Sequence, residues 1–160
     1  MTDIAIGWHE QTGFDLALTA GELETDTGLV TAILCSLFSW REAEPGDPLP
    51  DGDPDPKGWQ GDRFARINGD RIGSRLWLLR RAVISTDTLA RARAYGSEAL
   101  HWLVEDGAAA AVRFEVWRDL RDSVWTVRAR VTVTRHAPEG PLSLDFDDLW
   151  KRIARDDDGL

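Results

Sequence analysis

The chain has 160 residues, of which 42% are hydrophobic and 29% are charged, and its formal net charge is −9. This size and composition predict one globular domain with a buried core. The negative charge argues against non-specific nucleic-acid binding, which needs clustered cations. We expect neither a membrane span nor a secretion signal, because no apolar run is long enough and the first residues lack a basic start. The single cysteine, Cys35, rules out an internal disulfide and fits assembly in a reducing cytosol.

The first 38 residues predict a β-hairpin followed by a helix. Residues 3–8 and 14–18 alternate apolar and polar side chains on either side of the turn-forming "HEQTG". Thr25 or Asp26 can cap the helix that follows. Its apolar stripe comprises Leu29, Val30, Ile33, Leu34, Leu37 and Phe38. Cys35 lies just off this stripe, which favours a small, partly buried side chain over a nucleophile.

Residues 41–62 predict a long irregular loop. Five prolines and four glycines between residues 45 and 61 exclude a regular element there. Such a loop is either functional or disordered until it docks on a partner, and Trp59 is its expected anchor. The aspartates at positions 51, 53, 55 and 62 resemble the spacing of a calcium loop, but Pro56 stands where that loop needs glycine. We therefore predict no metal site.

The stretch "NGDRIGSRLWLLRR", residues 68–81, predicts a short buried helix. Gly73 permits a tight turn, and Ser74 can cap the helix. A short helix that is apolar nearly all round must be buried on most sides, so it is either a core helix or a joint with a partner. We favour the core for Trp77. The apolar residues that define this motif are Leu76, Trp77 and Leu79.

A long helix is predicted from Ser85 or Thr86, either of which can cap it, to Gly107. Its apolar face comprises Leu89, Ala92, Gly96, Ala99, Leu100 and Leu103, and the structural residue Trp102 lies in its last turns. Gly96 in the middle of that face predicts a close approach to another backbone. Arg91, Glu98 and Glu105 are assigned to the opposite, wet face.

The rest of the chain predicts a small sheet. Residues 111–118 and 124–135 alternate as an antiparallel pair that turns near "DLRDS", and residues 141–146 form a further strand. The expected fold class is α+β, with a small antiparallel or mixed sheet covered mainly on one face by helices, an N-terminal β-hairpin and the long Pro/Gly/Asp loop. We expect a single domain over residues 1–146, with a short helix and acidic tail over 147–160.

No convergent catalytic set is present, so we predict a protein that is not an enzyme and needs no cofactor. The three histidines, His9, His101 and His136, are scattered without metal-ligand spacing. Ser74 lacks the second glycine of a nucleophile elbow, and its glycine-rich surroundings lack the P-loop lysine. Because acidic residues are plentiful, a peptidoglycan hydrolase with an acid pair stays as the alternative.

The composition favours an interaction protein. The chain has eight tryptophans, and tryptophan and arginine are the residues most enriched in interface hot spots. Residues 41–62 carry seven acids against two cations, whereas residues 63–93 carry eight arginines against two acids. This asymmetry either aligns the protein with charged neighbours or reflects solvated faces. The candidate partner-binding residues are Trp59, Arg75, Arg80, Arg81, Arg128 and Arg130, of which Arg75, Arg80 and Arg81 are expected outside, facing an acidic partner.

Six segments, in order and over nearly the whole chain, carry a family resemblance: "DIAIGW", "FDLAL", "GLVTAILCSLFSWREAEPGDPLPDG", "KGWQGD", "DRIGSRLWLLRRAVIS" and "ARAYGSEALHWLVEDG". Together they resemble the phage Mu gene-product-forty-six family of contractile-tail baseplate proteins. The joint occurrence of "GWQGD", "GSRLWLL" and "EALHWL" is what makes the resemblance specific. That family is in turn similar to the T-even phage gene-product-twenty-five wedge proteins, from which the sheath starts. Those relatives usually carry a Glu-Pro-Arg motif where this sequence has "VEDGAAAAV".

The resemblance implies a structural baseplate wedge subunit of the virion tail, assembled in the bacterial host cytoplasm. It implies six copies around the tail tube, with other baseplate wedge proteins and the first sheath ring as partners and with no nucleic acid or membrane. A sheet edge that accepts a partner strand is the expected joint with the sheath. The particle is a phage, a defective prophage or a tail-like bacteriocin.

Overall fold

The computed structural model describes residues 28–154 except residues 53, 66–69 and 137–139, together with the backbone of short strands between residues 3 and 26. These short strands are β1 (Asp3–Ile4), β2 (Ile6–His9), β3 (Gly13–Leu16), β4 (Leu18–Thr19), β5 (Glu22–Leu23) and β6 (Thr25–Asp26). They pair in antiparallel fashion as β1 with β6, β2 with β3 and β4 with β5. The turn expected over "HEQTG" includes residues 10–12, which lie outside the described residues.

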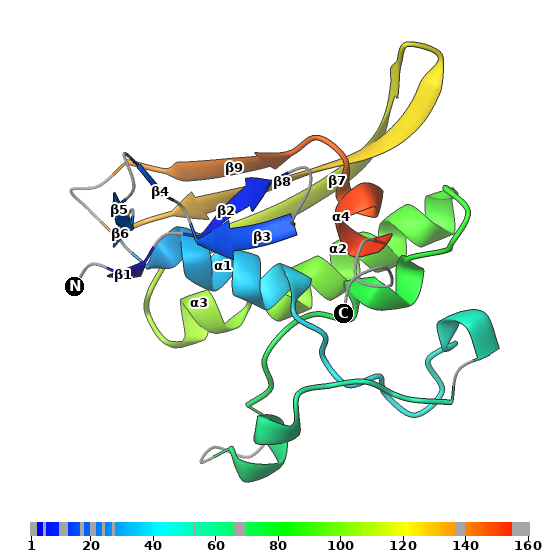
Figure 1. Cartoon of the computed structure of the whole chain (residues 1–160), viewed down its shortest axis with the longest axis horizontal. Coiled ribbons are helices and arrows are strands. Elements are labelled where there is room, and N and C mark those ends of the chain that lie inside the picture. The colour runs from blue at the N-terminus through cyan, green and yellow to red at the C-terminus, as the bar shows by residue number, and fades with distance from the viewer. Residues whose placement is uncertain are drawn as a thin grey trace.

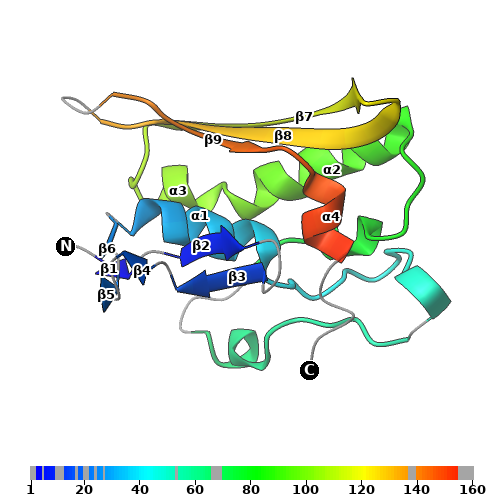
Figure 2. The ribbon, with the colours of Figure 1, turned by 45° about the horizontal axis from the view of Figure 1, so that its top comes forward.

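The centre of the fold is an antiparallel sheet in the order β7-β8-β9. Its strands are β7 (Ala111–Arg121), β8 (Val124–Thr134) and β9 (Leu142–Phe146). The helices α1 (Leu29–Phe38), α2 (Thr86–Ala99) and α3 (Trp102–Glu105) lie along one face of this sheet, and α4 (Leu149–Ala154) lies beside its end (Figures 1 and 2). The predicted α+β class is therefore confirmed, with an antiparallel sheet covered on one face.

Strict alternation in β7 and β8 explains why only one face of the sheet is buried. The core-facing side chains of these strands are Phe114, Val116, Val127, Ala129, Val131 and Val133. The hairpin turns at Asp122 and Ser123, both with positive φ (47° and 66°), as a two-residue primed turn requires. The opposite face carries polar and charged side chains. The antiparallel pair predicted from the alternation is thus confirmed, and β7 extends to Arg121, further toward the turn than predicted.

The helix predicted from Ser85 to Gly107 is interrupted. Ser85 caps α2 by accepting a hydrogen bond from the Thr88 N–H (3.1 Å), as expected. Near Leu100 the bonds change to the i→i+3 type, with the Leu103 N–H donating to the Leu100 carbonyl, and the chain continues as α3. Gly96 lies where α2 packs closely, but against the ring of Phe114 rather than against another backbone as predicted, because an added Cβ would overlap that ring.

The first long helix differs from its prediction in two details. α1 begins after Gly28, which has φ +77° and no side-chain cap, because Thr25 and Asp26 belong to strand β6. Cys35 is exposed rather than partly buried, since its position on α1 faces away from the sheet-side core. The stripe itself is confirmed at its centre, where Ile33 and Leu37 are almost fully buried.

The "LWLL" segment is a single 3-10 turn, η3 (Leu76–Leu79), and all four of its side chains are buried. It contacts α1, α2 and α4, and α4 adds Leu149 and Ile153 to the same core. Trp77 is only 3% exposed, and its Nε1 donates to the Arg41 carbonyl (2.8 Å). The prediction of a core position for Trp77 is confirmed.

Replacement of Trp77 by alanine is expected to destabilise the free protein by about 3–5 kcal/mol, because it leaves a cavity among η3, α1 and α4. For a chain of this size the melting temperature should fall by on the order of 10 °C. Thermal unfolding measures this directly. Trp59→Ala is the matched control, since Trp59 is 58% exposed and should leave the melting temperature within a few degrees. Equal melting temperatures for the two variants would contradict the core position.

Candidate functional site

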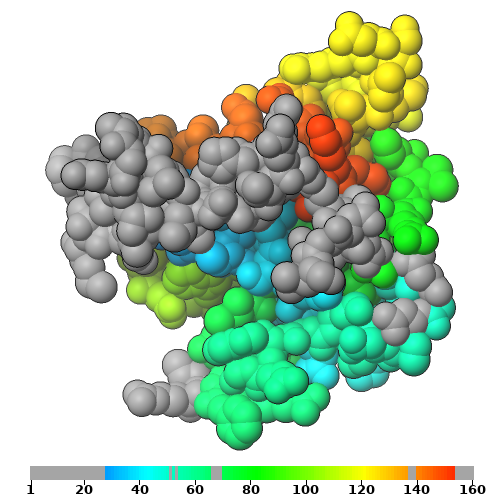
Figure 3. Space-filling view, in the orientation of Figure 1, coloured from blue at the N-terminus to red at the C-terminus, as the bar shows by residue number. Residues whose placement is uncertain are grey.

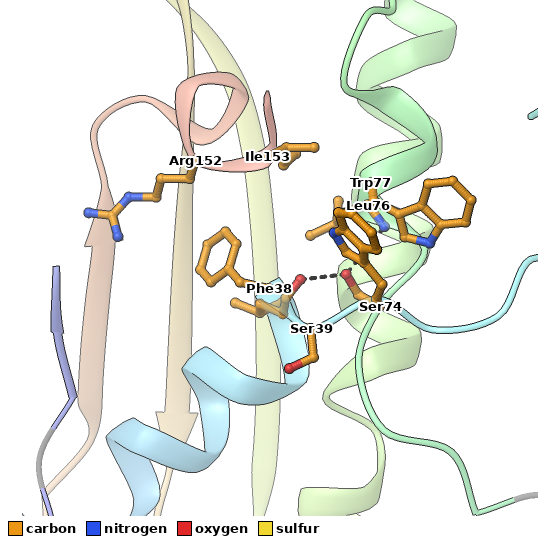
Figure 4. A pocket seen from close by; sticks show the side chains of 9 residues that line it. Phe38, Ser39, Ser74, Leu76, Trp77, Arg152 and Ile153 are labelled. Carbon is orange, nitrogen blue, oxygen red and sulfur yellow. Dashed lines mark hydrogen bonds between the residues drawn. The ribbon is translucent and has the colours of Figure 1, made fainter. Parts of the chain in front are cut away.

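The Gly73-Ser74 pair of the "NGDRIGSRLWLLRR" stretch ties the end of α1 to the start of η3 (Figure 4). The Ser74 N–H donates to the Ser39 carbonyl (2.9 Å), and the Arg41 N–H donates to the Ser74 carbonyl (3.1 Å). The Ser74 hydroxyl donates to the Leu37 carbonyl at the end of α1 and accepts from the Leu76 N–H (3.2 Å). The hydroxyl therefore both donates and accepts within the fold, and Ser74 is only 2% exposed.

Gly73 is required at the crossing. It has φ +92°, and a Cβ there would lie 2.4 Å from the Ser39 carbonyl oxygen. The hollow at this crossing, lined by Phe38, Trp77 and Arg152 among others, has a volume of about 10 Å³. Such a volume holds about one water molecule. The motif predicted from sequence as structural is therefore placed as a structural tie, and it has no room for a substrate.

Arg75 departs from its prediction, because it faces the protein rather than a partner. Its guanidinium bonds to Glu98 (2.8 and 3.2 Å) and to Asp47 (3.0 Å), and it lies 4.7 Å from the ring centroid of Tyr95. Arg41 adds a second cation to Glu98 at 3.3 Å. Burial alone would lower the pKa of Arg75, but the bonds to Glu98 and Asp47 outweigh it and hold that pKa above its usual value.

This cluster corrects the assignment of Glu98 to a wet helix face. Its oxygens bind the guanidinium groups of Arg75 and Arg41. Asp47 comes from the Pro/Gly/Asp loop, so the same cluster holds that loop against α2. The partners of Arg75 are 23 and 28 residues away in sequence, which is why a local charge pattern did not reveal them.

The other candidate arginines lie at two places. Arg80 is half-buried and Arg81 is exposed, both directly after η3. Arg128 and Arg130 lie on the open face of the sheet, where they pair with Asp147 (2.6 Å) and Asp145 (2.6 Å). Arg128 also lies over the Trp117 ring at 5.7 Å. The structure therefore does not bring the six candidate partner-binding residues together at one surface.

Trp59 forms part of an apolar groove with a volume of about 540 Å³. The groove lies between the end of α1 and the loop, and it is lined by Cys35, Phe38, Ser39, Trp40, Gly58, Trp59 and Ile72. No carboxylate or histidine is among these lining residues. Sequence reasoning identified Trp59 as an anchor, but it did not identify the groove, because its walls come from three separate segments.

Sequence reasoning also missed the tip of the β7–β8 hairpin. This tip projects beyond the helices (Figure 1), and Leu120, Val124 and Trp125 are 53%, 61% and 52% exposed. Leu120 and Trp125 are directly paired, so they share one face of the hairpin, and Val124 points to the other. The sequence signal that could have found the tip is the alternation of β7 and β8. Leu120 and Trp125 place apolar side chains on the buried face of these strands at positions that none of the described helices covers.

The described residues hold no group of three or more His, Cys, Asp or Glu side chains that could bind a metal ion. Within the same part of the chain, each helix is too short or too polar to span a bilayer. The features that stand out are therefore surfaces: the groove, the hairpin tip, the open sheet face and the charge cluster at Arg75.

Arg75→Met should loosen the loop while keeping the aliphatic stem packed against Tyr95. Hydrogen bonds to charged groups contribute about 1.5–3 kcal/mol, so amides whose protection depends on the cluster should exchange about ten times faster or more. The amides to follow are Ala43, which bonds to the Pro56 carbonyl, and Asp47, which bonds to the Glu44 carbonyl. Hydrogen exchange of the free protein gives the measurement, with exposed Arg81→Met as the control. Unchanged exchange at both amides would show that Arg75 does not hold the loop.

Comparison with known proteins identifies the family. Residues 29–140 match the family described as Phage protein GP46. The chain is 47% identical over 113 residues to the baseplate protein gp46 of Escherichia phage Mu. These residues cover 70% of this chain and 74% of that protein. It is 39% identical over 113 residues to the Mu-like prophage FluMu protein gp46 of Haemophilus influenzae, covering 71% and 74%. No solved structure matches the chain. The resemblance that the "GWQGD", "GSRLWLL" and "EALHWL" segments indicated is confirmed, and the chain belongs to the phage protein GP46 family.

Proposed function

We propose that this protein is a structural component of the baseplate of a contractile phage tail or tail-like particle. The observation that carries the proposal is the 47% identity to a protein named as a baseplate protein. The family match over residues 29–140 includes the tie around Ser74 and η3, so the same scaffold is expected across the family. In this role the protein acts by binding its neighbours rather than by turnover.

The finer part of the proposal is a wedge subunit that joins other wedge proteins and helps the sheath to start, in six copies around the tail tube. It rests on the resemblance to the T-even wedge proteins. Such a joint forms by addition of a partner strand to a sheet edge, which supplies main-chain hydrogen bonds. The two edges of this sheet, β7 and β9, differ in how well they could accept such a strand.

The β7 edge is obstructed. The closing pair of a two-residue hairpin, here Arg121 and Val124, is hydrogen-bonded, and bonded pairs then alternate along the strands. By this alternation the carbonyl of Val116 points away from β8, toward the free side of β7. Arg93 from α2 donates to that carbonyl (Nε to oxygen, 2.9 Å). An arginine bound to the middle of an edge strand blocks the approach of another strand.

The β9 edge suits the role better. The same alternation directs the backbone groups of Leu142, Leu144 and Phe146 toward β8, and those of Ser143 and Asp145 away from it. β9 is the terminal strand in the order β7-β8-β9, and among the described residues no backbone bond from outside the sheet reaches Ser143 or Asp145. We therefore assign the sheath-facing joint to the outer edge of β9.

Ser143→Pro tests this assignment, because it removes one outward N–H without removing a bond to β8. The free protein should melt within a few degrees of the wild type, while its incorporation into tail particles should fall at least several-fold. Incorporation is measured by mass spectrometry of purified particles in which the variant is the sole source of this subunit. Ser143→Ala keeps the N–H and should incorporate normally, and Leu144→Pro breaks the β8 ladder and should lower the melting temperature. Normal incorporation of Ser143→Pro would contradict the use of the β9 edge.

A turnover assay distinguishes the alternative function, a peptidoglycan hydrolase, from the structural one. If the protein is structural, the purified protein incubated with peptidoglycan should release no soluble fragments above buffer. Glu98 has a structural task in its bonds to Arg75 and Arg41, and Glu105 lies within 3.4 Å of His101 on an exposed helix turn. Turnover that disappears in Glu98→Gln or Glu105→Gln, with the folded state retained, would replace the structural proposal by the enzymatic one.

A further inference from the structure

The hairpin tip and the apolar groove are exposed apolar surfaces that one molecule cannot bring together. The tip stands clear of the body (Figures 1 and 3). The groove is lined instead by residues of the end of α1 and of the loop and by Ile72. Contiguous exposed apolar surface on a soluble protein marks an interaction site. We propose that the Leu120–Trp125 face of the hairpin tip docks into the Trp40–Trp59 groove of a second copy of this chain.

The shapes of the two surfaces are complementary. The tip face is a narrow projection in which Trp125 and Leu120 stand side by side across the hairpin. The groove, at about 540 Å³, falls within the roughly 300–1,000 Å³ range of sites that enclose a drug-sized ligand, and an indole ring is smaller than such a ligand. Its walls carry the aromatic rings of Phe38, Trp40 and Trp59, which pack well against an indole.

The charges at the two surfaces are complementary as well. The guanidinium of Arg118 lies 5.0 Å from the Trp125 ring centroid, so a cation accompanies the inserted ring. Carboxylates adjoin the groove: Glu42 packs against Gly58, and Asp62 accepts the Ile72 N–H (3.2 Å). The Lys57 ammonium, 5.4 Å from the Trp40 ring centroid, is itself paired with Asp55 (3.4 Å). Docking therefore places Arg118 beside carboxylates, which favours this partner over an unrelated apolar surface.

The occupant is a second copy because both halves of the contact are present on this chain. A contact between different surfaces of identical subunits is head-to-tail, and it closes into a ring when the rotation between copies allows. A buried tryptophan removes only about 150–250 Å² from water, well below the about 800 Å² per partner of a standard stable interface. The contact is therefore weak between free molecules, and a trapping experiment suits it better than a measurement of mass.

Disulfide trapping uses the single natural cysteine as a reporter, since Cys35 lines the groove. Wild-type protein is mixed with a size-tagged Cys35→Ser/Leu120→Cys variant at high protein concentration and oxidised with copper–phenanthroline. The wild type then carries a thiol only in the groove, and the variant only on the tip face. The mixed dimer should exceed either homodimer several-fold on a non-reducing gel.

The matched control places the thiol on the other face of the same tip, as Cys35→Ser/Val124→Cys. Val124 is as exposed as Leu120, so its thiol is equally accessible, but it should give only background mixed dimer. Adding Trp125→Ser to the Leu120 variant should lower the mixed dimer several-fold. Thermal melting of each variant confirms that it is folded, as expected for exposed positions.

Three outcomes would overturn the proposal. The first is mixed dimer no greater than in the Val124 control, and the second is mixed dimer that is insensitive to Trp125→Ser. The third is a homodimer in excess of the mixed dimer, which would mean that tip meets tip or groove meets groove. If the tip serves a different baseplate protein instead, the first outcome is the one observed. The experiment tests only the contact between copies of this chain. Its failure would therefore leave the baseplate proposal standing.

Discussion

The fold depends on the backbone crossing at Ser74. A single 3-10 turn such as η3 has poor hydrogen-bond geometry and little stability of its own, so its position must be imposed by the surrounding chain. The Ser74 hydroxyl imposes it by donating to the last turn of α1 and accepting from the N–H of Leu76. Gly73 allows the two backbones to approach closely enough for those bonds. Once the crossing is fixed, the side chains on either side of it have defined directions.

Those directions explain why a loop rich in proline and glycine is ordered where it leaves α1. Trp77 points inward and its Nε1 binds the Arg41 carbonyl, while Arg75, two residues earlier, points along α2 and binds Asp47. The chain between residues 41 and 47 is therefore held at both ends by residues of one motif. Farther along, the loop presents Trp59 to solvent. The same crossing thus supports the core on one side and shapes one wall of the groove on the other.

Local sequence patterns were sufficient where the structure is governed by near neighbours. The alternation of Val127, Ala129 and Val131 predicted both the β7–β8 pair and its buried face. Gly96 predicted a close approach by α2, although the neighbour is the ring of Phe114 rather than a backbone. Local patterns failed where contacts between residues far apart in the sequence determine the structure. The apolar spacing continues through Leu100, so the break between α2 and α3 is invisible in sequence. In the structure the break allows Trp102 to bind the Ser36 hydroxyl on α1 (3.0 Å). Likewise, the inward direction of Arg75 depends on Glu98 and Asp47, which no local pattern connects to it.

The sheet has two surfaces that could bind a partner, one through backbone hydrogen bonds and the other through burial of apolar side chains. The outer edge of β9 offers backbone donors and acceptors, which bind any extended segment with little regard to its side chains. The hairpin tip offers Leu120 and Trp125, whose burial depends on a cavity of matching shape. At the β7 edge, Arg93 removes the equivalent backbone site by binding the Val116 carbonyl. A sheet with one edge closed, one edge open and an apolar projection can therefore hold two partners at once without their competing for the same groups. Because β8 pairs with β7 along its whole length and with β9 over residues 129–133, both sites belong to one continuous sheet, which is the property that a subunit built into a regular assembly needs.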